Sequence, residues 1–503
     1  MGHTTSPRRL VVLGSAYLAA LTQAFNLRPK LDNTGITQDN FDPPIPSWKF
    51  DPSLNIPGAQ FPPNAHVPQK GSAGPKGKIA AALADAPVGT YQPLPSYDPW
   101  YRAPDGWESA APGSVLRVRQ HAYNMTPPAI LNVRDTFQVL FRSTDSQRNA
   151  SWGVTTVFIP KTPRCLENSS STSANCTQPI MSYQLPYDTS CLDASPSFGL
   201  QFGEPYGEIA VALSRGWWVS VPDYEGPLAS YGANIVAGFV TLDSMRSVIN
   251  VSSTLYGIPS AKVAMWGYSN GASATESAVE FAAEYAPNLR IEGAAIGGLS
   301  PNVAAAGPLL SQTQVAGLLV QGLIGVTSQY PPQRAYLVSR LNPSGPYNAT
   351  EFFWASYMSG WQSLLYFCYV DIFAYFIGGQ ADLVVPQITS MFEKEGTLGG
   401  FGKPNTKLYM YHAVDDDMTP VRDTDTLVTK LCAEGANILY HRNHWGGHND
   451  ELTNGRQRAL DYMGDVLDGD LGGKRDANSM GMPDTGCKTV ELTFMQDPGK
   501  PIV

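Results

Sequence analysis

The sequence has few basic residues and no marked cluster of them. Its 503 residues include 34 Lys and Arg against 43 Asp and Glu, which gives a formal net charge of −9. Nucleic acids and strongly anionic membrane surfaces attract proteins mainly through basic patches. The composition therefore argues against both as partners. An acidic surface is common among secreted proteins, so the charge indicates nothing more.

Two further features are missing. None of the six cysteines stands in a C-x-x-C pair, so we expect no cysteine-based metal site, and no other metal site or cofactor is predicted. After the N-terminal region, no stretch is both long and apolar enough to span a bilayer. We therefore expect a soluble mature protein without stable membrane insertion, and we expect it to be a monomer. There are no internal repeats.

The N-terminus has the pattern of a secretory signal peptide. Arg8 and Arg9 precede an apolar run over residues 10–21, and the small residue Ala24 follows. This order predicts cleavage near Ala24 and a secreted, extracellular product. A membrane anchor is the alternative, but the run is short for a span. Six Asn-x-Ser/Thr sequons fit a secreted glycoprotein, although some will stay unmodified: Asn124, Asn149, Asn168, Asn175, Asn250 and Asn348.

From about residue 114, candidate strands and helices alternate along the chain. This alternation predicts an α/β fold with a mostly parallel sheet. After Leu299 it gives way to apolar, helix-like runs, which we interpret as an inserted helical cap or lid. The predicted parts are a signal peptide (1–24), a Pro-rich extension (25–94), a first core part (95–299), the cap (300–403), a second core part (404–470) and a loop-like tail (471–503).

The stretch "MWGYSNGASAT", residues 265–275, places Ser269 between Gly267 and Gly271 where a predicted strand becomes a helix. Such a turn is a nucleophile elbow: it is so tight that glycine is needed two residues before and after the serine. The hydroxyl then stands clear of the sheet, and the N–H of Asn270 points into a helix N-terminus that favours negative charge. G-x-S-x-G alone also occurs by chance, so the prediction requires an acid and then a histidine downstream.

Both are present in that order. "YHAVDDDMTPV" places three aspartates after a late predicted strand, and we choose Asp416 as the acid, with Asp417 as the alternative. Asp382 is a weaker candidate because it lies inside the cap. "HRNHWGGHNDEL" supplies His448 after two glycines and before the last helix, with His444 as the alternative. The order Ser, Asp, His is that of the α/β-hydrolase fold.

These residues predict a mechanism. His448 takes the proton of Ser269 during attack on an acyl carbonyl, and Asp416 orients the imidazole. The oxyanion is bound by the N–H of Asn270 and by a second donor from the loop after an early strand, "SYQLPYD", residues 182–188.

An even number of cysteines in an oxidising compartment predicts three disulfides. The first pair flanks a polar loop, the second would tie the cap to the rim of the site, and the third would fix the C-terminal tail. The expected pairs are Cys165–Cys176, Cys191–Cys368 and Cys432–Cys487. The alternative is that one pair stays reduced, with Cys432 buried in its helix.

Several segments together resemble the fungal secretory lipase family. They are "YDPWYRAPDGW", "SYQLPYD", "VPDYEGPLASY", "GYSNGA", "YHAVDDDMTPV", "LCAEGANILY" and "GGH", spread over about residues 95–490. The resemblance implies Ser269 as nucleophile, Asp416 as acid, His448 as base and Asp188 as the oxyanion aspartate. It also suggests the second and third cysteine pairs.

The resemblance implies hydrolysis of triacylglycerols or other carboxylic esters at an oil–water interface, under a helical lid. Asn270 stands where a second glycine is common, and Tyr187 where a glutamate is usual, so the substrate preference is open. A short-chain esterase, an acyltransferase or a peptidase of the same fold remains an alternative. A non-catalytic binding protein of this fold is the alternative from another class, and the complete Ser, Asp and His set argues against it.

Overall fold

The computed structural model describes residues 94–121, 132–165, 176–202, 206–303, 307–469 and 481–496. The predicted signal peptide, nearly all of the Pro-rich extension and the sequons at Asn124, Asn168 and Asn175 lie outside these residues. Among the helices it describes, none is long and apolar enough to cross a membrane.

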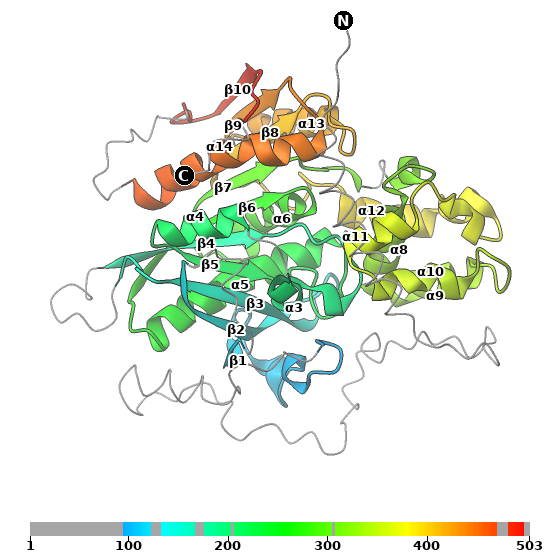
Figure 1. Ribbon diagram of the computed structural model, residues 1–503, viewed down its shortest axis with the longest axis horizontal. Coiled ribbons are helices and arrows are strands. Elements are labelled where there is room, and N and C mark those ends of the chain that lie inside the picture. Colours follow the sequence, from blue (N-terminus) through cyan, green and yellow to red (C-terminus); the bar gives the residue numbers. More distant parts are fainter. Residues whose placement is uncertain are drawn as a thin grey trace, which may run out of the picture.

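A ten-stranded sheet runs through the described part of the chain in the order β1-β2-β3-β5-β4-β6-β7-β8-β9-β10 (Figure 1). The pairs β1–β2, β2–β3 and β3–β5 are antiparallel, and all the other pairs are parallel. The strands are β1 (Val115–Gln120), β2 (Val133–Thr144), β3 (Ala150–Pro160), β4 (Thr177–Gln184), β5 (Trp218–Pro222), β6 (Ser260–Tyr268), β7 (Ile291–Gly297), β8 (Lys407–Ala413), β9 (Asn437–Asn443) and β10 (Cys487–Leu492).

Helices cover both faces of this sheet. On one face, α5 (Asn234–Thr254), α6 (Asn270–Tyr285) and α13 (Val421–Ala433) pack apolar side chains such as Phe239 and Leu431 against the strands. On the other face, α4 (Gly207–Ser214) and α14 (His448–Asp468) form a second core. A parallel sheet buried on both faces explains the nearly continuous apolar runs in its central strands. The short helix α3 (Pro196–Gly199) precedes α4.

Between β7 and β8 the described chain forms helices and only two isolated β-bridges. The helices are α8 (Ala316–Ser328), α9 (Pro331–Arg340), α10 (Ala349–Phe353), α11 (Gly360–Tyr366) and α12 (Pro386–Gly396). They gather beside one end of the sheet in Figure 1 and enclose an apolar core of their own, to which Leu323, Phe352 and Phe367 belong. We call this segment, residues 298–406, the cap.

The C-terminal tail differs from the prediction. It was expected to be loop-like, with β9 as the last strand, but residues 487–492 form β10, which pairs in parallel with β9. Its residues are mostly exposed, so the strand lacks the apolar run by which a buried strand is recognised. A disulfide at its first residue, Cys487, links it to Cys432 of α13.

Candidate active site

Ser269 occupies the turn between β6 and α6 and has the strained backbone angles φ 55° and ψ −123°. A side chain at Gly271 would overlap the carbonyl oxygen of Gln184 in β4, and one at Gly267 would overlap the backbone of Gly271. The N–H of Ser269 donates to the carbonyl of Gly297 at 2.9 Å. Strain of this kind costs roughly 1–3 kcal/mol and persists only where the surroundings impose it. Here both glycines and the neighbouring strands do so.

The structure brings Ser269, His448 and Asp416 together from three separate elements. Ser269 Oγ lies 3.0 Å from His448 Nε2, and His448 Nδ1 lies 2.7 Å from Asp416 Oδ2. His448 is the first residue of α14, and its ring is nearly buried. Because Nδ1 faces a carboxylate, we assign the ring hydrogen to Nδ1, which leaves Nε2 free to accept the serine proton.

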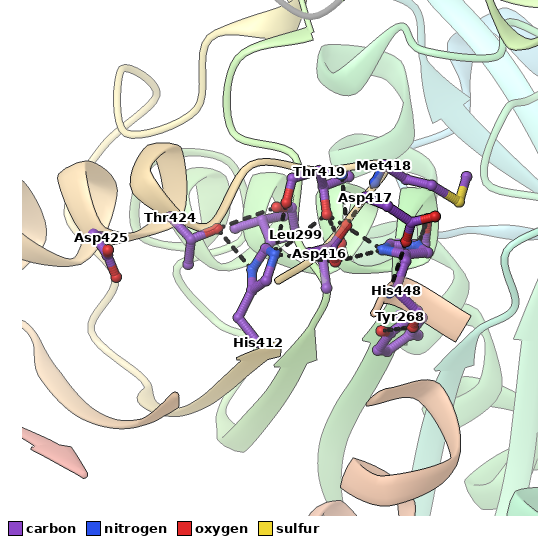
Figure 2. A network of polar contacts seen from close by, with 12 residues as sticks. Tyr268, Leu299, His412, Asp416, Asp417, Met418, Thr419, Thr424, Asp425 and His448 are labelled. Atoms are coloured by element: carbon purple, nitrogen blue, oxygen red, sulfur yellow. Dashed lines mark hydrogen bonds and ion pairs between the residues drawn. The ribbon is translucent and has the colours of Figure 1, made fainter. Parts of the chain in front are cut away.

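The Asp416 side chain is fully buried, yet its environment favours the ionised form. Its Oδ1 accepts the N–H groups of Met418 (2.9 Å) and Thr419 (2.7 Å), while Oδ2 faces two imidazoles (Figure 2). Burial pushes the pKa of Asp416 upward, but the hydrogen bonds and charges of His412 and His448 outweigh it and hold the pKa well below its usual range. A carboxylate with this many donors stays charged at any pH at which His448 can act as a base.

His412 is the residue in this network that the sequence analysis missed. It lies in β8, is fully buried, and places Nε2 3.2 Å from Asp416 Oδ2 and 2.9 Å from the carbonyl oxygen of Thr419. Both neighbours are acceptors, so Nε2 carries a hydrogen. Thr424 meets the other ring nitrogen at 3.1 Å. His412 therefore supports Asp416 from behind. Its position four residues before the acid was the available signal.

The alternative acids and histidines lie elsewhere. Asp382 pairs with Arg340 inside the cap at 2.8 Å. His444 meets Glu491 of β10 at 2.6 Å and is half exposed. Asp417 Oδ1 accepts the backbone N–H of His448 at 3.2 Å, so it supports the start of α14 and not the imidazole. Only Asp416 reaches His448 Nδ1 among these candidates.

The segment after β4 approaches Ser269 from the other side of β6. Asp188 has a positive φ of 47°, and its Oδ1 is shielded from solvent without a hydrogen-bond partner among the described residues. Burial raises the pKa of Asp188 to about 6, against a smaller opposing effect of His448. The cap holds this segment in place, because the Thr189 hydroxyl donates to the carbonyl of Met358 at 2.6 Å and Ser190 bonds the side chain of Gln321. Gly360 also packs directly on the Asp188 backbone.

A cavity of about 390 Å³ opens beside Ser269 and Asn270 and extends among the cap helices. Its cap walls are largely apolar, with Leu319, Leu323 and Phe392 among them. A mostly apolar cavity that ends at a few polar groups suits a substrate with one long or bulky apolar part.

Comparison with known proteins shows the family of this chain. A sequence model of secretory lipases matches residues 198–473. The chain is 41% identical to a trichothecene C-3 esterase of Fusarium sporotrichioides over 76% of its own length and 87% of that protein. It is 33% identical to lipase A of Arthroderma benhamiae over 76% and 81% of the two chains. The chain belongs to the secretory lipase family.

Solved structures place this chain in the α/β-hydrolase fold. The closed state of Candida antarctica lipase A superposes with a TM-score of 0.66 at 26% identity, over 76% of this chain and 89% of that one. The predicted fold class is thereby confirmed. With its lipase and esterase relatives, the chain is an ester hydrolase.

The cysteines of the chain follow the prediction in part. The structure contains the bonds Cys165–Cys176 and Cys432–Cys487. The expected bond between Cys191 and Cys368 is absent: Cys191 is a free thiol buried just after the oxyanion segment, and Cys368 is a free thiol on the cap surface. Cys368 lies in the cap and Cys191 outside it, and the first thiol is exposed whereas the second is buried.

Among the described sequons, Asn149 and Asn250 are exposed. Asn348 is half buried and caps α10, because its side-chain oxygen accepts the N–H of Glu351 at 3.0 Å. The described residues hold no cluster of His, Cys, Asp and Glu that could bind a metal ion.

Proposed function

We propose that this protein is a secreted serine hydrolase that cleaves carboxylic esters through an acyl-enzyme on Ser269. The observation that carries the proposal is the continuous hydrogen-bonded line from Ser269 Oγ to His448 to Asp416, with separations of 3.0 and 2.7 Å. These are the distances that a nucleophile, its base and the orienting acid require.

In the proposed reaction, Ser269 Oγ attacks the ester carbonyl carbon while His448 Nε2 takes its proton. Asp416 stabilises the imidazolium that forms. The N–H groups of Asn270 and Asp188 donate to the tetrahedral oxyanion. Collapse of this intermediate breaks the bond to the alkoxy oxygen, which receives the proton from His448. Water then repeats the sequence on the acyl-serine and releases the acid.

For the substrate we propose a triacylglycerol presented at an oil–water interface. Eight of the thirteen large hydrophobic side chains that are exposed in the described part of the chain lie in the cap, with Trp361 at 74% and Tyr369 at 68% exposure. Residues 341–381 of the cap contain no Lys or Arg. An aromatic surface without positive charge fits an uncharged lipid surface better than an anionic one.

A second candidate is an esterase that removes a short acyl group from a bulky alcohol. It is favoured by the higher identity to the trichothecene C-3 esterase of Fusarium sporotrichioides (41%) than to the lipase A of Arthroderma benhamiae (33%). In this case the apolar cavity would accommodate the alcohol and not the acyl chain.

One set of measurements tests the lipase and the short-chain esterase proposals together. Hydrolysis of p-nitrophenyl esters from acetate to palmitate, with and without an emulsified interface, should show higher kcat/KM on long chains and a rise at the interface for a lipase. Preference for acetate with no interfacial rise would favour the second candidate. The Ser269→Ala variant should be folded and lose at least ~10⁴-fold in kcat. If that variant keeps substantial activity, the serine mechanism is wrong for both.

A further inference from the structure

The two donors proposed for the oxyanion belong to different parts of the core. A single short loop, which follows β5, forms hydrogen bonds to residues of both parts. One wall of the oxyanion hole is the segment from Leu185 to Asp188 after β4, and the other is Asn270 at the start of α6. The loop after β5 contains Tyr224 and Glu225, both at most 1% exposed.

Tyr224 bonds both walls through its hydroxyl group. The hydroxyl donates to the carbonyl oxygen of Leu185 at 2.9 Å and accepts from Asn270 Nδ2 at 3.1 Å. Its ring also packs edge-on against the ring of Tyr187, with 4.9 Å between centroids.

Glu225 makes a second, parallel connection. Its backbone N–H donates to the Tyr187 hydroxyl at 2.9 Å, and its Oε1 accepts from Asn270 Nδ2 at 3.1 Å. The side chain of Asn270 is thus held by two acceptors and directed toward the loop. A glycine at position 270 would have no side chain to make these two hydrogen bonds.

We propose that Tyr224 and Glu225 are positioning residues that hold the two walls of the oxyanion hole at a fixed separation. We call the pair the clamp. It acts on the reaction through Asn270, whose own N–H is one of the proposed oxyanion donors, and so the inference rests on the proposed function. Displacing a donor by a fraction of an ångström weakens binding of the transition state more than binding of the substrate, since the donors are aimed at the oxyanion.

The environment of Glu225 supports a neutral carboxyl in the clamp. Burial raises the pKa of Glu225 well above its usual range, and the nearby charge of Asp188 raises it further, against smaller effects of the Tyr187 and Asn270 hydrogen bonds. A glutamine therefore has both the shape and the charge of the native side chain. The conservative variant can thus separate the loss of the hydrogen bond from general damage to the loop.

The test compares kcat and KM on a soluble short-chain ester for Tyr224→Phe, Asn270→Ala and their double mutant. Each single variant should lose about tenfold in kcat with KM changed less than twofold. The kcat of the double mutant should be little lower than that of either single variant, because both changes remove the hydrogen bond between Asn270 and the Tyr224 hydroxyl. Glu225→Gln should keep kcat within about twofold, while Glu225→Leu should lose it as Asn270→Ala does.

Tyr285→Phe is the matched control. It removes a partly buried hydroxyl at the C-terminal end of α6, the helix that begins at Asn270, where the hydroxyl bonds Thr144 and Asp243. The kcat of this variant should stay within twofold. The rate of inactivation by a p-nitrophenyl alkylphosphonate, which forms a tetrahedral adduct on the serine, should fall in parallel with kcat in the clamp variants.

Folding is checked by thermal unfolding of each variant, and Asn270→Ala, which alters a half-exposed side chain, decides the case if Tyr224→Phe does not fold. Wild-type kcat in folded Asn270→Ala, or fully additive losses in the double mutant, would overturn the clamp. Activity that survives in Ser269→Ala would instead overturn the serine mechanism, so the two failures are distinguishable.

Discussion

Two carboxyl-bearing segments approach Ser269 from opposite sides of β6, and their charges are compensated in opposite ways. After β8, Asp416 accepts two backbone N–H groups and faces two imidazoles, which keeps its pKa well below the usual range despite burial. After β4, Asp188 has a shielded oxygen without a partner among the described residues, and its pKa is raised to about 6 by burial. The same residue type thus has its pKa lowered beside the base and raised beside the oxyanion hole.

This difference suits the charges of the proposed reaction. A fixed anion next to His448 stabilises the imidazolium of the transition state. A fixed anion beside the oxyanion would instead repel it, so a carboxyl group whose pKa is raised by burial costs less there. The electrostatic asymmetry follows from the number of donors around each carboxyl group and not from its depth of burial.

The largest expected effect comes from removing the anion. Asp416→Asn should lower kcat by ~10³–10⁴-fold with little change in KM, since an amide favours the wrong imidazole tautomer. Steady-state kinetics on a soluble ester measure this. Asp415→Asn is the matched control, because Asp415 is exposed, and it should remain within twofold. A comparable loss in Asp415→Asn or in Asp382→Asn would show that the acid is misassigned.

A change on the oxyanion side should have a smaller effect. A methyl group at Gly360 would lie 2.9 Å from the carbonyl oxygens of both Tyr187 and Asp188, so the cap or the oxyanion segment must shift. We expect Gly360→Ala to lower kcat by ~10–100-fold, most of it without a change in KM. Gly400→Ala is the control, since its nearest atom lies at 3.6 Å. Equal kinetics in the two variants would mean that the cap does not position Asp188.

Replacing the second imidazole should have a smaller effect again. His412→Leu removes a donor from Asp416 Oδ2, and we expect kcat to fall by about tenfold. With one donor fewer, the Asp416 anion should attract the proton on His448 more strongly, so the acid limb of the pH–rate profile should move to higher pH. His412→Gln places an amide donor near the position of Nε2 and should restore part of the loss. If His412→Leu only lowers thermal stability and leaves the pH profile unchanged, His412 is a structural residue.

The sequence predicts the parts of this site whose determinants are local. Ser269 is recognisable from two glycines at a strand–helix junction, and His448 from two glycines before a helix. Each depends on a few neighbouring residues whose backbone requirements are known. The alternation of strands and helices was likewise sufficient to predict the mostly parallel sheet.

Non-local contacts were harder to predict. The choice of Asp416 among three adjacent aspartates depends on which one faces His448, 32 residues later. His412 has the appearance of an ordinary strand residue until β8 is placed beside the turn. β10 lies 44 residues after the end of β9 and has little apolar character. The bond expected between Cys191 and Cys368 failed because spacing does not show which way a side chain points.

The last expected effect concerns stability and not kcat, and it uses another buried acid near the oxyanion side. Asp223 directly precedes the clamp and accepts the N–H and hydroxyl of Ser197 at 2.8 and 2.5 Å. Burial raises its pKa from 3.8 to about 7, although these two hydrogen bonds oppose the shift. The folded protein therefore binds this proton more tightly than the unfolded chain. The stability it contributes is present below about pH 4 and is lost as the pH rises to about 7.

The amide in Asp223→Asn cannot ionise, so this variant should lose the part of the pH dependence of stability that comes from Asp223. Unfolding free energies measured between pH 4 and 8 should fall less steeply with rising pH in Asp223→Asn than in the parent, by roughly 4 kcal/mol over the interval. Asp105→Asn, at an exposed position, should reproduce the slope of the parent. Parallel curves for the parent and Asp223→Asn would mean that Asp223 is already ionised in the folded state. In that case the contrast between the lowered pKa of the acid after β8 and the raised pKa values around the oxyanion hole would be limited to Asp188 and Glu225.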